Sequence, residues 1–293
     1  MYYRRKLILG LLEVFGGQLE RLRFQKLLFL LTRSQQNPTY DFVPYKYGCF
    51  SFSANADLCT MQKYAQVAEE GNYWKKTEQK SYLTELSAND RSALLALHSR
   101  YKSASADDLI RLTYRRHPWF ATNSTIKEEK LDKEELAAVE ATRATDATPM
   151  LFTIGYEGIS LEAYLTKLLK NNVKILCDVR RNPLSMKYGF SKKQLENACK
   201  GVNITYTHVP GLGIESEKRQ SLSEQKDYDI LFAQYARRIQ QQPEELAAVQ
   251  QLIEKHGRVA LTCFEAKVCQ CHRGTLAQFL ASRPGWPYSL RHL

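Results

Sequence analysis

The 293-residue chain has no run of about 18 apolar residues, the length that a membrane-spanning helix needs. The apolar stretch over residues 7–12 meets Glu13 too soon for a signal peptide, and no small-residue cleavage site follows it. The seven cysteines are an odd number, which does not suit a framework of disulfides. We therefore expect a cytoplasmic protein with free thiols and no membrane partner.

The familiar phosphate-binding motifs are also absent. The chain has no G-x-G-x-x-G and no G-x-x-x-x-G-K-[ST] segment, so neither common nucleotide cradle is present. A Cys-x5-Arg phosphatase loop is excluded at Cys263 because position 269 is a cysteine. The run Cys263-x5-Cys269-x-Cys271-His272 has zinc-ligand residue types, but it lacks a second C-x2-C pair and matches no familiar structural spacing. We therefore expect no cofactor and assign no metal ligand, but binding of a metal by Cys263, Cys269, Cys271 and His272 stays open.

What the chain does have is a globular composition and an excess of positive charge. Hydrophobic residues make up 44% and charged residues 25%, close to average usage. The formal net charge is +11, and the surplus is spread over both halves of the chain. Such a surplus favours an anionic partner, with nucleic acid or another phosphate-bearing ligand as the leading class. An ordinary basic surface is the alternative, and the oligomeric state is left open.

The length suggests two domains. Residues 1–125 are predicted to be a mainly helical module whose order of helices and a short β-ribbon is that of a winged-helix-like domain; an all-helical accessory domain is the alternative. Residues 126–148 are rich in Thr, Ala, Lys and Glu and lack aromatic residues, which predicts a linker. Residues 149–293 alternate strands with helices, which predicts an α/β domain with a parallel sheet.

Polar segments follow three of the four strands that we expect in this second domain. Because ligands bind beyond the carboxyl ends of parallel strands, these segments should form one pocket. After the first strand come Gly155, Tyr156, Glu157 and Gly158. After the second come Asp178, Arg180, Arg181, Asn182 and Pro183. After the fourth come Cys263 and Glu265, with Cys271, His272 and Arg273 opening the next helix.

The residue types in this pocket indicate their roles. Acid–base or nucleophilic chemistry is assigned to Glu157, Asp178, Glu265, Cys271 and His272. Substrate binding is assigned to Gly155, Tyr156, Arg180, Arg181, Asn182, Cys263 and Arg273, since guanidinium groups bind phosphate at two points. Simpler roles stay open: turn glycines, an aspartate that caps a loop, a solvated arginine pair and buried apolar thiols.

The ordered set Thr153-Ile154-Gly155-Tyr156-Glu157-Gly158, Asp178-Val179-Arg180-Arg181-Asn182-Pro183, Phe190-Ser191-Lys192 and Cys263-Phe264-Glu265…Cys271-His272-Arg273 resembles the domain-of-unknown-function family 488. Segment 113–124 is similar to longer members that carry a helical N-terminal module. The resemblance implies a Rossmann-like fold and a pocket of this makeup, but no known reaction. From the residues we expect an enzyme that hydrolyses a glycosidic or phosphoester bond in a nucleic acid or nucleotide. The alternative is a non-catalytic nucleic-acid-binding regulator or defence component that senses a small anion.

Overall fold

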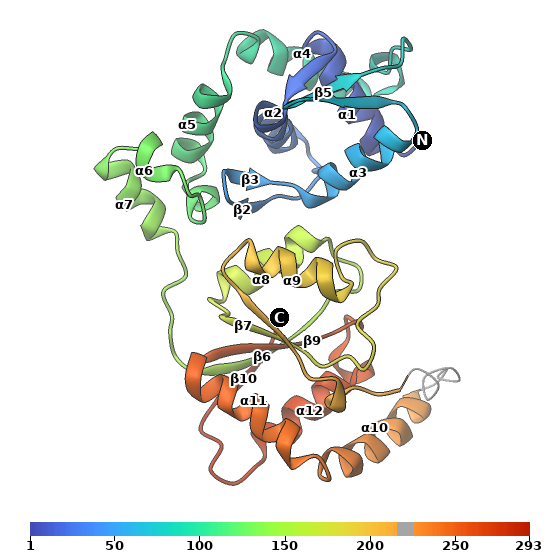
Figure 1. Ribbon diagram of the computed structural model, residues 1–293, viewed down its shortest axis with the longest axis vertical. Helices are drawn as coiled ribbons and strands as arrows, with labels where there is room; N and C mark the ends of the chain where they lie inside the picture. Colours follow the sequence, from blue (N-terminus) through green and yellow to red (C-terminus); the bar gives the residue numbers. More distant parts are fainter. Residues whose placement is uncertain (216–224) are drawn as a thin grey trace. The chain divides into compact units, whose positions relative to one another are not determined.

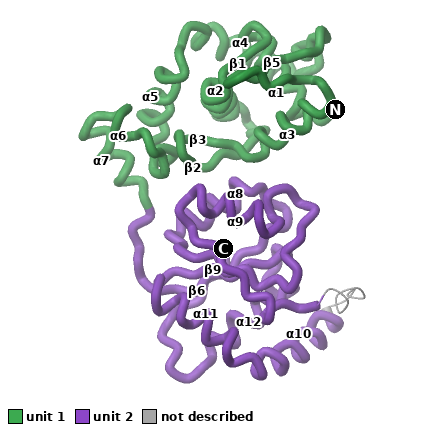
Figure 2. The backbone as a smooth tube through the Cα atoms, viewed as in Figure 1, with its two compact units in different colours: residues 1–143 green, residues 144–293 purple. Residues whose placement is uncertain are grey.

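The structure, a computed structural model, describes residues 1–215 and 225–293 (Figure 1). The chain forms two compact units, residues 1–143 and residues 144–293 (Figure 2). Each unit has a hydrophobic core of its own. Among the described helices, none is both long and apolar enough to cross a membrane.

The N-terminal unit is mainly helical, as predicted. Its helices are α1 (Tyr3–Val14), α2 (Arg21–Ser34), α3 (Phe52–Lys63), α4 (Ala88–Tyr101), α5 (Ala106–Arg116), α6 (Lys127–Lys130) and α7 (Lys133–Ala141). Its strands are β1 (Gln18–Glu20), β2 (Val43–Tyr45), β3 (Gly48–Phe50), β4 (Val67–Glu70) and β5 (Tyr73–Lys76). β2 and β3 form an antiparallel hairpin, and β1, β5 and β4 form a separate small sheet. The apolar stripes of α1 and α2 build most of the core.

Segment 126–148, which we expected to be a linker, is largely helical. It contains α6 and α7, and Val139 of α7 is buried in a small core with Tyr114 and Ala121. Asp132 and Glu135 begin α7 with a capping box, in which each side chain accepts a hydrogen bond from the other residue's backbone N–H. The composition of Ala, Glu and Lys that suggested a linker also favours helix, and the first compact unit extends to residue 143.

The C-terminal unit is an α/β domain with a five-stranded parallel sheet of order β10-β6-β9-β7-β8. The strands are β6 (Met150–Gly155), β7 (Ile175–Asp178), β8 (Thr205–His208), β9 (Arg258–Cys263) and β10 (Ser289–His292). The helices are α8 (Leu161–Lys170), α9 (Lys192–Lys200), α10 (Gln225–Ile239), α11 (Pro243–His256) and α12 (His272–Ala281). Helices α8 and α9 cover one face of the sheet, and α10, α11 and α12 cover the other (Figure 1). This arrangement confirms the predicted Rossmann-like class.

The burial of the strands explains which of them the sequence reveals. β6, β7 and β9 are buried along almost their whole length, so they read as apolar runs. β10 lies at the edge and exposes most of its residues, and the sequence analysis missed it. Because all five strands run parallel, the loops that follow Gly155, Asp178, His208 and Cys263 lie along one edge of the sheet.

Candidate functional site

A pocket of about 610 Å³ lies at the carboxyl edge of the sheet, where the sequence analysis expected one. Its lining combines cations, apolar side chains and one thiol. The lining residues are Tyr156, Arg180, Arg181, Asn182, Leu184, Ser185, Met186, Lys187, Ile214, Cys263 and Phe264. Cys263 lies at its base, since it lines the pocket although almost none of its surface is exposed.

Asp178 and Arg180 form a buried ion pair in one wall of this pocket. The Arg180 Nε atom lies 2.9 Å and 3.1 Å from the two carboxylate oxygens of Asp178, and Arg180 Nη2 lies 2.5 Å from Oδ2. The backbone N–H of Arg180 and the hydroxyl of Tyr206 also donate to this carboxylate, at 3.0 Å and 2.7 Å. Asp178 is fully buried and Arg180 is 5% exposed.

The Nη1 group of Arg180 is also used within the fold. It donates to the Tyr156 hydroxyl at 2.7 Å and to the Phe190 carbonyl oxygen at 2.9 Å. Burial alone would lower the pKa of Arg180, but the hydrogen bonds and charge of Asp178 raise it above its ordinary value. Both oxygens of the Asp178 carboxylate are therefore engaged within the fold, by Arg180 and Tyr206.

A second cluster fixes the loop over residues 264–266 against the turn that follows β6. The backbone N–H groups of Tyr156 and Glu157 donate to the Phe264 carbonyl oxygen, and the Glu157 carboxylate accepts from the Ala266 N–H at 2.9 Å. Arg273, only 1% exposed, donates to the carbonyl oxygens of Glu265 and Ala266. Arg273 is therefore engaged with backbone rather than turned to the pocket.

The loop over residues 264–266 approaches the end of β6 closely at Gly155. A Cβ atom at this position would lie 1.9 Å from the Glu265 carbonyl oxygen, so only glycine fits. Gly155 thus permits a close backbone approach and is not among the residues that line the pocket.

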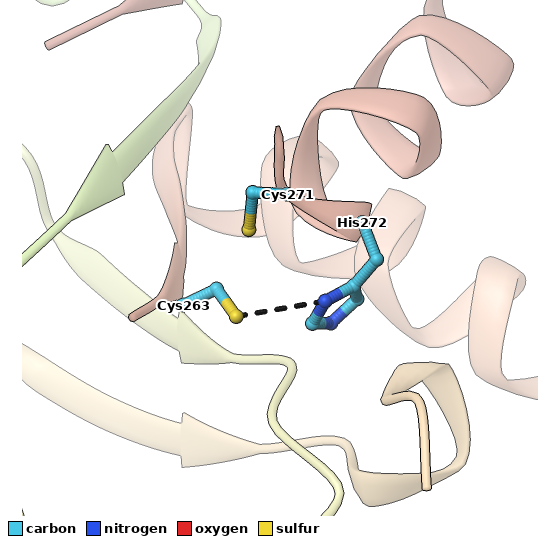
Figure 3. Close-up of side chains that lie close together, drawn as sticks. All are labelled: Cys263, Cys271 and His272. Atoms are coloured by element: carbon cyan, nitrogen blue, oxygen red, sulfur yellow. Dashed lines mark hydrogen bonds between the residues drawn. The ribbon is translucent and has the colours of Figure 1, made fainter. Parts of the chain in front are cut away.

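Three buried side chains from β9 and the start of α12 converge beneath the pocket (Figure 3). The thiols of Cys263 and Cys271 and a ring nitrogen of His272 all lie within 4.8 Å of one another. Cys263 Sγ is 3.5 Å from His272 Nδ1 and 3.2 Å from Glu265 Oε2. Burial, together with the hydrogen bond and charge of Cys263, raises the pKa of the Cys271 thiol well above its ordinary value.

The polar segments expected at the three strand ends therefore lie at one edge of the sheet, where they form separate hydrogen-bond networks. Residues 160–280 match the family described as "Domain of unknown function DUF488". The C-terminal unit carries a DUF488 domain. The resemblance drawn from the motifs is thereby confirmed, and the helical N-terminal unit precedes the matched region. No curated protein and no solved structure matches the chain.

Within the DUF488 domain, the polar side chains that line the pocket differ in part from those expected. Arg181 and Asn182 line it and are exposed. Lys187, which the sequence analysis missed, lines it as well, and its Nζ donates to the Tyr156 carbonyl oxygen at 2.6 Å. Burial lowers the pKa of Lys187, and the charge of Glu157 acts in the opposite direction.

Three further residues of the DUF488 domain escaped sequence reasoning. Tyr206 donates to Asp178, and His208 Nε2 lies 2.8 Å from the Arg180 carbonyl oxygen. Ile214 belongs to the loop after β8 and lines the pocket. Their position in the chain could have revealed Tyr206 and His208, because both stand at the carboxyl end of the third predicted strand. The analysis passed over this strand end because it lacks a cluster of charged residues.

Proposed function

We propose that the DUF488 domain is an enzyme that hydrolyses a phosphoester bond in a nucleotide or nucleic acid. The observation that carries this proposal is the composition of the pocket, in which Arg181 and Lys187 line the wall and the thiol of Cys263 lies at the base. A volume of about 610 Å³ is within the range of roughly 300–1,000 Å³ that small-molecule sites occupy.

The cations supply the affinity for phosphate. Arginine binds phosphate oxygens through two parallel N–H groups, and lysine adds a mobile point charge. The rim adds apolar surface, since Leu184 is 75% exposed and Phe264 is 42% exposed, and both line the pocket. An apolar rim beside two cations suits a ligand with a planar base and a phosphate.

The distribution of carboxylates favours phosphoester over glycosidic hydrolysis. Glycoside hydrolysis usually needs two carboxylates placed on either side of the scissile bond. Asp178 is paired with Arg180, and Glu157 accepts from the Ala266 N–H. Glu265 is the carboxylate best placed for acid–base work, because its Oε2 lies 3.2 Å from Cys263 Sγ, which also contacts His272 Nδ1. The seven free cysteines fit a reducing cytoplasm.

The test is a panel of probes on the full chain: p-nitrophenyl phosphate, bis(p-nitrophenyl) phosphate, nucleoside mono-, di- and triphosphates, and short DNA and RNA strands. We expect turnover of at least one probe, a loss of about tenfold or more in Arg181→Ala, and near-complete loss in Cys263→Ser. Lys255→Ala is the matched control, because Lys255 is an exposed cation at the end of α11, just before β9 begins. Absence of turnover with every probe would refute the enzymatic proposal.

A second candidate function, a nucleic-acid-binding regulator, is favoured by a pocket of about 270 Å³ in the N-terminal unit. Its lining includes Arg21, Lys46, Tyr45 and Trp74, and the Arg21 guanidinium lies 5.3 Å from the centre of the Trp74 ring. Cations interleaved with aromatic rings suit single strands of nucleic acid. Here a winged-helix role for the β2–β3 hairpin stays a proposal.

Fluorescence anisotropy with labelled single and double strands tests this second function. Affinity should be measurable at about 50 mM salt and should fall steeply as salt rises. Arg21→Ala and Lys46→Ala should each reduce the salt slope by about one, whereas Lys63→Ala, an exposed lysine at the end of α3, should not. Binding without turnover of any probe would favour the regulator over the enzyme.

A further inference from the structure

We propose that Cys263, Cys271 and His272 bind one Zn²⁺ ion, with the fourth coordination position open to the pocket. The sequence assigned no metal ligand here because the spacing of these residues matches no familiar structural site, and it left metal binding open. The ligand atoms of the three residues lie within 4.8 Å of one another, and all three residues are buried. Two thiols and an imidazole are the donor types that zinc prefers.

The distance between Cys263 and His272 fits a tetrahedral ion. Bond lengths of about 2.3 Å to sulfur and about 2.0 Å to nitrogen place neighbouring ligand atoms roughly 3.5–3.8 Å apart. Cys263 Sγ and His272 Nδ1 are 3.5 Å apart. Figure 3 shows both thiols and the ring turned towards the same space. The Cys271 thiol lies within 4.8 Å of both atoms, and a shift towards them completes three ligands.

A backbone carbonyl group orients the ring of His272, as is usual for histidines that bind a metal. His272 Nε2 lies 3.0 Å from the Val179 carbonyl oxygen, which can only accept a hydrogen bond. Nε2 therefore carries the proton of the neutral ring, and Nδ1 presents its lone pair to the two sulfur atoms. A backbone carbonyl that orients the ring in this way is the usual outer partner of a zinc-bound histidine.

The open position points to a catalytic rather than a structural ion. Catalytic zinc sites have three protein ligands and a water, and Cys263 joins this cluster to the pocket. Glu265 Oε2, 3.2 Å from Cys263 Sγ, is placed to accept a proton from such a water. This role rests on the proposed function. The water oxygen forms a bond to phosphorus, the ester P–O bond breaks, and the leaving oxygen takes the proton from Glu265.

The zinc content of the purified full chain tests the binding directly. After dialysis against metal-free buffer, plasma mass spectrometry should give about one zinc per chain. Exchange for Co²⁺ should produce the sulfur-to-cobalt charge-transfer band and the visible bands of a tetrahedral ion. The cobalt spectrum of the unsubstituted protein keeps the test valid even where a variant fails to fold.

Substitutions then locate the ion. Cys263→Ser, Cys271→Ser and His272→Gln should each weaken Zn²⁺ binding by at least about tenfold in competition with a chromophoric chelator. Cys269→Ser is the matched control, because Cys269 is exposed and two residues from Cys271, and its affinity should stay unchanged. A chain without zinc or a tetrahedral cobalt spectrum, a Cys263–Cys271 disulfide in its place, or equal loss in Cys269→Ser would overturn the proposal.

The two proposals fail in different ways. Bound zinc without turnover of any phosphate probe would refute the enzymatic function and leave the metal site standing. Turnover that survives complete removal of zinc would refute the metal's role and leave the function standing.

Discussion

The Nε2 atom of His272 lies 3.0 Å from the carbonyl oxygen of Val179, and this contact decides how the ring meets its other neighbours. Val179 is the residue between Asp178 and Arg180, so the ion pair in the pocket wall and the thiol cluster beneath it share one stretch of backbone. The contact with Val179 holds Nε2 at the end of β7, and the opposite ring nitrogen, Nδ1, lies 3.5 Å from Cys263 Sγ.

This contact predicts the tautomer of His272. In the folded protein the neutral ring should carry its proton on Nε2, because a carbonyl oxygen cannot donate. Long-range ¹H–¹⁵N spectra of the full chain at pH 8 distinguish the two ring nitrogens. His256, an exposed residue at the end of α11, is the internal control and should show both tautomers in exchange. A proton found on Nδ1 of His272 would contradict the assignment.

Asp178 should be a stability residue. Asp178→Ala leaves the guanidinium of Arg180, 5% exposed, without its counter-charge, which should cost about 3–5 kcal/mol of unfolding free energy. Arg180→Met should cost a similar amount, and the double variant should cost less than the sum because the two changes remove one interaction.

Calorimetry of the full chain, read on the transition of the C-terminal unit, measures these costs. Glu254→Ala is the control, since Glu254 is an exposed carboxylate of the same unit and should change stability by less than about 1 kcal/mol. A fully stable Asp178→Ala protein would show that the buried pair is dispensable and would return Asp178 to the list of catalytic candidates.

How much of the fold and the site the sequence predicts depends on how far apart in the chain the interacting residues are. The buried strands, the carboxyl edge of the sheet and the motifs could be predicted from the sequence. The pattern of apolar residues indicates the strands, and the position of the motifs directly after them indicates the edge. The hydrogen-bond partners of Asp178 were not accessible from the sequence, because one of them, Tyr206, is 28 residues away in the chain. The same holds for Glu157, whose partner is the backbone N–H of Ala266. The sequence alone does not distinguish a polar residue at a strand end that binds a ligand from one that holds a loop.

Lys26 of the N-terminal unit should make stability depend on pH. It is 1% exposed and donates to the carbonyl oxygens of Tyr47 and Cys49. Burial lowers the pKa of Lys26 below its ordinary value of 10.5, and the charge and hydrogen bond of Cys49 oppose the shift. The folded state therefore loses this proton before the unfolded state does, so the cost of the buried charge is full at low pH and fades as pH rises towards 10.5.

The stability of the natural chain relative to Lys26→Met should accordingly increase between the lowered pKa and 10.5. Urea unfolding at a series of pH values, read on the N-terminal transition, gives this difference. Lys46→Met, which removes an exposed lysine of the same β2–β3 hairpin region, should show no such trend. A difference that is flat in pH would mean that Lys26 keeps an ordinary pKa in the fold.

Gly155 should prove as important to the site as any charged residue. Its Cβ in Gly155→Ala would meet the Glu265 carbonyl oxygen at 1.9 Å, so the loop over residues 264–266 must move. We expect a loss of about 1–3 kcal/mol from overpacking and the loss of the hydrogen bonds from Tyr156 and Glu157 to the Phe264 carbonyl oxygen. Amide hydrogen exchange reports those two N–H groups directly.

Gly158→Ala is the control from the same turn. Gly158 has φ +76°, so alanine is strained there by about 1–2 kcal/mol, yet no atom lies within 4 Å of the new Cβ. Both variants should lose stability, but only Gly155→Ala should lose protection at Tyr156 and Glu157. The comparison separates backbone strain from displacement of the loop that carries Glu265. Equal protection in the two variants would mean that the loop can retreat at no cost and that the close approach at Gly155 does not position the site.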